Sequence, residues 1–524
     1  MPLLAKTFLF LTMNPAILLS IVLLYFLVLL GIAFVTSRHS NNESFFIGNR
    51  NSKWWLVAFG MIGTSLSGMT FISVSGTVGK TGFNYFQVVI GYWLGYFAVA
   101  FILLPLYYRL KLTSIYTYLE GRLGMVSYKT GAMFFIISRT MGATLRLYLV
   151  IKVLEKFVLR DMGISFELTS VIILALILLY TFRGGVKTIV WTDTLQTTFM
   201  LLALIVCVCY IGGSLHLDAQ SCWLAMHDHG FTRMFTLDPL SPSFFVKQIA
   251  GGAFVTIAMT GLDQEMMQKN ISVSNLKDSR KNMLTLSFLQ ALVVFIFLSL
   301  GGLLYLYGIS KGGAFQSAMV NGKSQLQFIL DGKNIIGDDI FPVLAFHYMP
   351  PYISVIFIIG LISALFPSAD GALTALTSSF CIDILGIRRN PGLGEQKQKN
   401  IRLIVHNSFA IIFLGCVFIF RYIDNGSLIQ LLLVVAGYTY GPLLALFAFG
   451  IFTRRRVING LVPIACIAAP ILCYFLKQYD TSLLHGYVIG TELLIINAGI
   501  SFVLLLLISK KGDGRATINR DMLQ

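Results

Sequence analysis

Six charged residues lie inside stretches of sequence that are otherwise apolar, namely Arg139, Arg146, Asp193, Lys247, Asp370 and Glu492. A charge at membrane depth is costly, so it usually faces a partner or a cavity that carries ions or solute. Arg139 and Arg146 are seven positions apart and therefore share one face of a helix. A guanidinium can bind a carboxylate of a solute, or it can pair with an acidic side chain and lock helices together. Both interpretations stay open for the two arginines.

The segment around Asp370 has the composition of a cation site. Asp370 follows Pro367 and Ser368 and precedes Gly371. Hard cations prefer oxygen ligands, which a carboxylate, a hydroxyl and a kinked backbone can supply. Pro367 has no N–H, so the carbonyl of Ser363 loses its helical partner and becomes available nearby. The segment therefore predicts a bound cation within a membrane helix.

Two apolar stretches contain glycine and hydroxyl residues in their middles. Residues 59–70 read Phe-Gly-Met-Ile-Gly-Thr-Ser-Leu-Ser-Gly-Met-Thr, and residues 251–261 read Gly-Gly-Ala-Phe-Val-Thr-Ile-Ala-Met-Thr-Gly. They lie five spans apart, as discontinuous helices do in transporters built from inverted repeats. An unwound turn frees carbonyls for a cation, and the N-terminus of a half-helix can face an anion. The alternative is close packing of unbroken helices through small residues.

Membrane helices must position these residues. Of the 524 residues, 56% are hydrophobic and 12% are charged, whereas soluble domains carry about 25% charged residues. Many apolar runs approach the length that crosses about 30 Å of hydrocarbon. We predict an all-α polytopic membrane protein with about thirteen spans, at 14–37, 54–79, 83–108, 131–151, 166–182, 189–213, 244–268, 283–307, 352–380, 403–420, 427–452, 457–475 and 486–509.

The distribution of basic residues predicts the orientation of these spans. If the loop after the first span is cytoplasmic, the cytoplasmic segments hold 25 of the 39 Lys and Arg residues and the exterior segments hold 11. An excess of basic residues marks the cytoplasmic side. The N-terminus is therefore expected outside and the C-terminus inside. The longest loop, about 308–350, is then exterior, and we expect a short helix over residues 323–330.

Composition and motifs exclude several function classes. The net charge of +16 is spread over short loops without a basic helix face, so we expect no nucleic-acid partner. Metal-binding Cys/His sets and H-E-x-x-H are missing from the sequence, so we expect no enzyme. We expect a single transmembrane transporter domain over residues 1–524. Its core repeats would span about 54–213 and 244–452, with peripheral helices at 14–37, 457–475 and 486–509.

Four segments together are specific enough to indicate a family. They are Arg183-Gly184-Gly185-Val186 with Trp191-Thr192-Asp193-Thr194-Leu195-Gln196, then Gly261-Leu262-Asp263-Gln264-Glu265-Met266-Met267-Gln268-Lys269, then Asp339-Ile340-Phe341-Pro342, and the stretch from Ser363 to Asp383. With them the chain resembles the sodium/solute symporter family, which includes sodium-coupled sugar, proline and sialic acid transporters. The likeness covers nearly the whole chain. It implies a LeuT-type core of five plus five helices in inverted repeats, located in the cell membrane, that carries a small organic solute together with sodium by alternating access.

The resemblance also implies a sodium site between the second and ninth spans. Its oxygen donors would be main-chain carbonyls and hydroxyls, and a further sodium site would include an aspartate. The matching residues here are Gly63, Leu66, Ala364, Ser368, Asp370 and Asp193. Pro367 replaces one hydroxyl of the family pattern, and a carboxylate replaces another at Asp370.

A solute site beside the cation follows from the same resemblance. The residues expected to line it are Ser65, Ser67, Thr70, Gln87 and Arg139, with Thr256 from the seventh span. In the sialic acid transporters an arginine in the span matching the fourth binds the solute carboxylate, and Arg139 lies close to that position. An anionic solute is therefore expected, with no cofactor other than the coupling ion.

Three alternatives to sodium-coupled symport stay open at this point. A buried carboxylate has a raised pKa unless a cation or donor offsets its desolvation, so Asp370 could instead make the coupling ion a proton. A channel would need a pore-lining ring or filter segments, and the sequence shows none. A transport-like sensor would need an output domain, and no segment is long enough for one.

Overall fold

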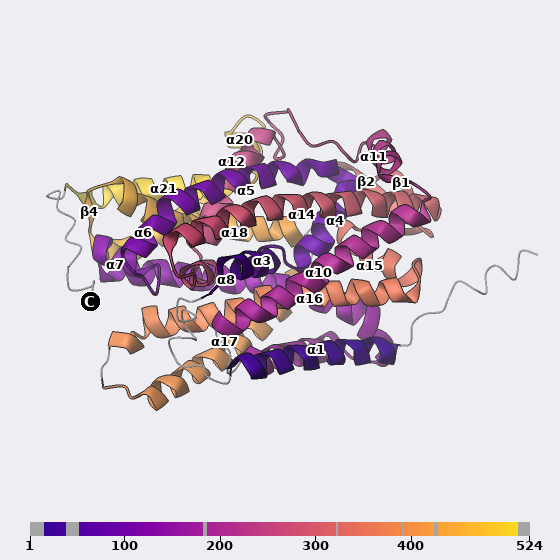
Figure 1. Cartoon of the computed structure of the whole chain (residues 1–524). Coiled ribbons are helices and arrows are strands. Elements are labelled where there is room, and N and C mark those ends of the chain that lie inside the picture. Colours follow the sequence, from indigo (N-terminus) through magenta and orange to yellow (C-terminus); the bar gives the residue numbers. More distant parts are fainter. Residues whose placement is uncertain are drawn as a thin grey trace, which may run out of the picture.

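The structure, a computed structural model, describes residues 15–37, 52–181, 186–320, 323–389, 392–423 and 428–511. Over these ranges the chain is predominantly helical, and its long helices run along one common direction (Figure 1). The predicted motif residues Arg183, Gly184 and Gly185 and the segments at both chain ends fall outside these ranges. The common direction of the helices is the arrangement that a bilayer requires, because only intrahelical bonding satisfies the backbone there.

The helices of the first half follow the predicted spans closely. They are α1 (Pro15–Ser37), α3 (Trp54–Ser65), α4 (Ser75–Thr81), α5 (Phe86–Ala98), α6 (Leu104–Arg109), α7 (Thr117–Leu123), α8 (Met125–Leu154), α9 (Phe166–Thr181), α10 (Val186–Ser214) and α11 (Ala219–Asp228). π-Helical turns join α3 to α4 and α5 to α6, at η2 (Thr70–Val74) and η4 (Val99–Leu103).

The second half contains one strongly bent pair and several long helices. They are α12 (Phe245–Thr256) with η7 (Ile257–Gly261), α13 (Gln264–Ile271), α14 (Leu276–Ser310), α15 (Gly337–His347), α16 (Pro351–Ser379), α17 (Glu395–Ile423), α18 (Leu428–Phe452), α19 (Val462–Gln478), α20 (Asp480–Leu483) and α21 (Leu493–Leu507).

Within the described ranges, nine helices are long and apolar enough to cross a membrane, or ten if the bent pair Phe245–Gly261 and Gln264–Ile271 is one span. Three shorter apolar helices are Trp54–Ser65, Phe166–Leu179 and Leu493–Leu507. The chain is therefore a multi-pass membrane protein. The number of thirteen spans and the sidedness of the two termini stay predictions.

The predicted helix at 323–330 is wrong, because these residues form a strand. β1 (Ala314–Val320), β2 (Lys323–Leu330) and β3 (Lys333–Ile335) make an antiparallel sheet in the order β1-β2-β3. Phe328 and Leu330 are buried, whereas Gln327 and Ile329 are only partly buried. The Phe328 ring packs against Tyr305 at 5.3 Å between ring centroids. Burial of Phe328 and Leu330, two positions apart, follows the period of a strand and not of a helix. The sheet and α11 lie at one end of the bundle, and α7 and β4 (Arg456–Val457) lie at the other (Figure 1).

The glycine-rich segment 251–261 stays helical, and the seventh span breaks just after it. The helix axis bends by 64° between Gly261 and Gln264. Asp263 begins the next helix, because its carboxylate accepts the backbone N–H groups of Glu265 at 2.9 Å and Met266 at 3.2 Å. Gly252 instead serves packing, since an added Cβ would lie 2.2 Å from the carbonyl oxygen of Val88 on α5. The glycines of this segment therefore serve helix packing, and the break predicted within it lies just beyond its last residue.

Candidate functional site

The second span is interrupted where the sequence predicted. α3 ends at Ser65, and Leu66 has φ −100° and ψ 86°, outside the helical region. The Leu66 N–H still donates to the carbonyl of Ile62 at 2.7 Å, and helical bonding resumes from Thr70 to Ser67 at 2.8 Å. The last carbonyls of a helix have no donor four residues further on. Gly63 and Leu66, whose carbonyls were predicted to bind a cation, therefore lie at this interruption.

α3 meets α10 and α16 at Gly63. A Cβ added there would lie 2.4 Å from Thr197 Oγ1 and 3.4 Å from Pro367 Cγ. The Gly63 N–H donates to Thr197 Oγ1 at 3.1 Å. On α16, Ala364 and Ser368 are fully buried close to Pro367. The structure therefore brings together the two segments predicted to share a cation, and a side chain at residue 63 would separate them.

Asp193 lies against this junction but already has a cationic partner. Lys269 Nζ is 2.7 Å from Asp193 Oδ2, 2.7 Å from Thr64 Oγ1 and 3.2 Å from Glu265 Oε1. Thr64 Oγ1 also donates to Asp193 Oδ2 at 3.2 Å. These contacts join α3, α10 and α13. The predicted seventh span ends at residue 268, which puts Lys269 in a cytoplasmic loop, yet only 3% of Lys269 is exposed, because α13 folds back into the bundle after the bend.

Arg139 has acidic partners rather than an open position. Its guanidinium pairs with Glu265 and lies 3.7 Å from Asp263 Oδ2. Asp263 Oδ2 also accepts a hydrogen bond from the hydroxyl of Tyr440 at 2.9 Å. All four side chains are at least 97% buried. These pairs support helix locking for Arg139, which also lines the cavity described below, so its binding of solute stays a prediction.

Arg139, Asp193, Asp263, Glu265 and Lys269 together form a buried charged cluster, and Asp370 on α16 lies beside it. Its Oδ1 accepts the backbone N–H of Gly371 at 2.5 Å. A Cβ added at Gly371 would lie 2.2 Å from Glu265 Oε1. Glu265 therefore fills the space that a larger residue would need at position 371, and α13 packs closely against α16 there.

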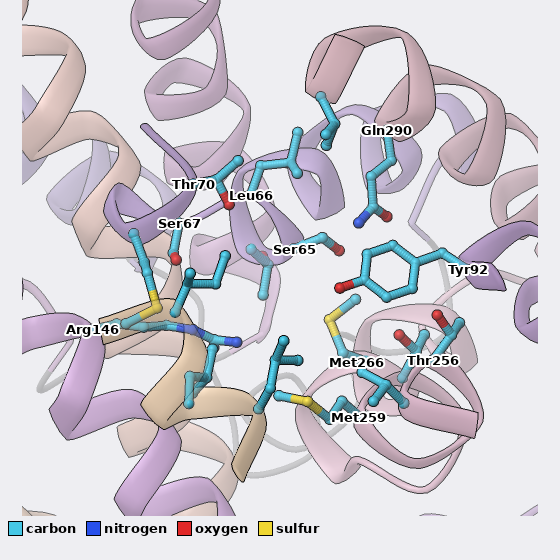
Figure 2. Close-up of a pocket in the computed structure, with 18 of the residues that line it drawn as sticks. Ser65, Leu66, Ser67, Thr70, Tyr92, Arg146, Thr256, Met259, Met266 and Gln290 are labelled. Carbon is cyan, nitrogen blue, oxygen red and sulfur yellow. The ribbon is translucent and has the colours of Figure 1, made fainter. Parts of the chain in front are cut away.

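A polar cavity of about 90 Å³ opens at the break of the second span. Figure 2 shows Ser65, Ser67 and Arg146 around this space, with Tyr92 and Gln290 across from them. Residues of α3, α5, α8, α12, α13, α14 and α18 line it, namely Thr64, Ser65, Leu66, Ser67, Met69, Thr70, Tyr85, Tyr92, Tyr96, Arg139, Arg146, Val255, Thr256, Met259, Thr260, Met266, Gln290, Val294, Ile429, Leu432 and Leu433. Five residues predicted to bind solute are among them, including Thr256.

Arg146 is the basic group that reaches into this cavity. It is 93% buried, and among the described residues its Nε and Nη1 atoms have no hydrogen-bond partner. Figure 2 shows the guanidinium pointing into the cavity near Ser67. Buried charges are normally paired. Arg146 thus brings two unpaired guanidinium nitrogens to the wall of the cavity.

Gln87 is placed elsewhere. It is fully buried, and its Nε2 donates to the carbonyls of Asn84 at 3.1 Å and Ser243 at 3.4 Å. Its Oε1 accepts the backbone N–H of Thr236 at 3.4 Å. It ties the start of α5 to the segment before α12 and does not line the cavity.

Sequence reasoning missed three members of the charged cluster. Asp263, Glu265 and Lys269 were noted only as part of a family-like segment. A signal was present, because residues 263–269 carry three charges directly after an apolar span. The partners of these charges lie on α3, α8 and α10, far away in the sequence, so pairing could not be read from spacing.

Two interrupted helices, a polar cavity at the first break and buried charges around it define the class of the protein: a membrane transporter that holds a small solute and an ion within the bilayer. The sequence profile of the sodium:solute symporter family matches residues 45–462. The chain belongs to this family. Sodium-coupled symport of a solute is the function of that class, and sodium is the coupling ion.

Individual relatives agree with this assignment. The chain is 23% identical over 490 residues to the sodium/sialic acid symporter SiaT of Proteus mirabilis (strain HI4320), which covers 90% of this chain and 91% of the relative. It is 23% identical over 446 residues to a putative sodium-dependent multivitamin transporter of Drosophila melanogaster, covering 82% of this chain and 69% of that protein. A solved structure of a substrate-bound, outward-open sodium-coupled sialic acid symporter superposes with a TM-score of 0.78 at 19% identity, covering 95% and 99% of the two chains. The last comparison shows a shared fold.

Proposed function

We propose that the protein carries a small anionic solute together with sodium, and that Arg146 binds the negative charge of the solute. The observation that carries this proposal is the buried guanidinium of Arg146, whose Nε and Nη1 have no partner among the described residues, at the wall of the cavity. An Arg fork suits a carboxylate, because two parallel N–H groups can bind both oxygens. The hydroxyls of Ser67 and Thr70 lie on the same cavity and would bind polar groups of the solute.

The sodium ion is proposed to bind between α3 and α16, beside the solute. The carbonyls of Gly63, Leu66 and Ala364 and the hydroxyl of Ser368 would be its ligands, with Asp370 nearby. Contact between Gly63 and Pro367 supports this placement, because it brings the two ligand segments together. Asp193 is not part of this proposed ion site, since Lys269 is bonded to it.

A single transport domain with two five-helix repeats accounts for the two breaks. One break follows α3, in the second span, and the other follows η7, in the seventh. Cation binding at the first break would favour the outward-open form, and coupled transport requires that ion and solute prefer the same conformations. The membrane potential adds about 2.3 kcal/mol per elementary charge per 100 mV.

A thermal-shift screen followed by uptake tests the proposal. Purified protein would be heated with sialic acid, lactate, neutral sugars or amino acids, each in sodium and in choline chloride. We expect an acidic compound to stabilise the protein only in sodium. The same compound, radiolabelled, should then accumulate in liposomes that contain the protein when sodium is higher outside.

The controls separate this function from its rivals. N-acetylmannosamine is a neutral amino sugar and serves as the matched control for sialic acid. Flux that does not saturate would indicate a channel, and uptake driven by a proton gradient without sodium would contradict the coupling ion. Stabilisation by neutral sugars alone would overturn the anionic solute.

A further inference from the structure

We propose that an apolar groove beside α18 and α21, together with the basic residues that follow these two helices, binds one anionic phospholipid. The inference goes beyond the transport of solute and sodium, because it concerns a molecule held at the surface of the helix bundle. It starts from a cavity of about 400 Å³ that shares no lining residue with the solute cavity.

The groove is apolar throughout. Its lining residues come from α5, η4, α12, η7, α18 and α21, and none of them has a polar side chain. Ile102 and Phe452 line it and are exposed, so the groove opens to the surroundings of the bundle. Protein interiors hold few voids larger than a water molecule, and a bound water needs polar partners that this groove does not offer. Because the chain lies in a membrane, an acyl chain is the molecule that suits the groove.

Basic residues follow both helices that border the groove. Residues 454–456 are all arginine and begin two positions after Phe452, the last residue of α18, and residues 510–511 are both lysine and follow α21. They lie at the end of the bundle where Figure 1 shows β4 and α7. The ion pairs among the described residues include none of these five basic residues. Clusters of basic residues next to a membrane helix attract anionic lipid headgroups.

The pairing of β4 with β5 (Ser509–Lys510) brings two of these charges together. Arg456 lies directly opposite Lys510 in the antiparallel ladder, and both residues are exposed. Like charges directly opposite each other on a ladder are destabilising. Arg455 helps to hold this arrangement, because its Nε donates to the hydroxyl of Ser509 at 2.7 Å. A phosphate group bound by Arg456 and Lys510 would offset the repulsion through charge-assisted hydrogen bonds.

One phospholipid joins the two features, since its acyl chain lies in the groove while its phosphate binds the basic residues. The groove also borders the bend of the seventh span, because Ile257 of η7 and Leu262 line it. Leu103 of η4 lines it as well, and a Cβ added at Gly261 would lie 2.5 Å from Leu103 Cδ1. The lipid therefore packs against two π-helical turns. A ligand that binds only the folded state raises the Tm, so this lipid should stabilise the bundle.

Native mass spectrometry of purified protein in detergent tests the inference. Phosphatidylglycerol and phosphatidylcholine with the same acyl chains would be titrated into wild type, into Ala448→Phe, which fills the groove, and into Arg454→Gln/Arg456→Gln. We expect wild type to bind one phosphatidylglycerol at least about tenfold more tightly than phosphatidylcholine, with a rise in Tm. Ala448→Phe should weaken the binding of phosphatidylglycerol at least about tenfold, and the double variant should bind the two lipids alike.

Two matched controls carry the same substitutions elsewhere. Ala468 on α19 is half-buried and does not line the groove, so Ala468→Phe adds an equal ring at another place. Lys397 and Lys399 at the start of α17 are exposed, so Lys397→Gln/Lys399→Gln removes an equal charge. Both controls should bind phosphatidylglycerol as wild type does.

Each other result would overturn the inference. Equal binding of the two lipids by wild type, unchanged binding of phosphatidylglycerol by either test variant, or an equal loss in the controls would show that the basic residues only orient the helices. A dimer that becomes a monomer in Ala448→Phe would assign the groove to a second copy of the chain. Equal stabilisation by inorganic phosphate would assign the basic residues to a free anion. If Ala448→Phe does not fold, Arg454→Gln/Arg456→Gln decides, because both of its side chains are exposed.

Discussion

Replacing Arg146 by Met, and Arg139 by Met on the same face of α8, tests which arginine binds solute and which one holds helices together. Methionine keeps most of the volume and removes the charge. Arg146 and Arg139 lie seven residues apart on α8, but Arg139 has Glu265 and Asp263 as partners whereas no described residue bonds Nε or Nη1 of Arg146. The same substitution at the two positions should therefore have opposite effects on stability.

The magnitudes follow from these surroundings. A hydrogen bond to a charged group contributes about 1.5–3 kcal/mol, so loss of a fork with two such bonds costs at least about 3 kcal/mol. At about 1.4 kcal/mol per tenfold, the apparent Km for an acidic solute should rise roughly 100-fold. Without solute, Arg146→Met should raise the Tm, because an unpaired buried charge costs several kcal/mol. Arg139→Met removes a cationic partner from the buried carboxylates of Glu265 and Asp263, and breaking a buried ion pair in this way costs about 3–5 kcal/mol.

The assay combines sodium-driven uptake in liposomes with thermal unfolding of the same purified preparations. Arg139→Met is the matched control, and we expect it to lower the Tm clearly in the absence of solute. Sodium binding to Arg146→Met should stay close to that of wild type, which shows that the loss concerns solute. An unchanged Km in Arg146→Met, or a Tm lowered as far as in Arg139→Met, would refute the assignment of Arg146.

Two glycine substitutions test the helix contacts around the ion. Gly63→Ala places a Cβ 2.4 Å from Thr197 Oγ1, so α3 must move away from α10 and α16. The sodium concentration for half-maximal thermal stabilisation should then rise at least about tenfold. Gly499→Ala on α21, where nothing lies within 4 Å of the added Cβ, is the matched control, and an equal sodium dependence of the two variants would contradict the site. Gly371→Ala places a Cβ 2.2 Å from Glu265 Oε1, so the Glu265 carboxylate should move away from Lys269 and the Tm should fall by several degrees. A Tm equal to that of wild type would show that α13 and α16 are not tightly packed there.

The positions of the membrane helices were predictable because hydrophobicity is a local property of the chain. A span of 166–182 was expected and α9 covers Phe166–Thr181, while 427–452 was expected and α18 covers Leu428–Phe452. The composition of the second span offered an interruption as one of two interpretations, since two glycines and three hydroxyl residues lie within six positions of the chain, 63–68, and the structure realises it after Ser65. The break in the seventh span was placed too early, because its glycines serve packing against α5 and the helix start depends on the capping carboxylate of Asp263.

The sequence by itself determined that the chain crosses a membrane many times and that two arginines share one face of α8. Only the tertiary structure decided which of these arginines meets acidic partners, because Glu265 is 126 positions from Arg139 and reaches it through the bend before α13. The same bend buries Lys269 against Asp193, although its position after an apolar run is typical of a loop. Pairing of buried charges depends on which helices become neighbours, and that is a property of packing over the whole bundle rather than of local spacing.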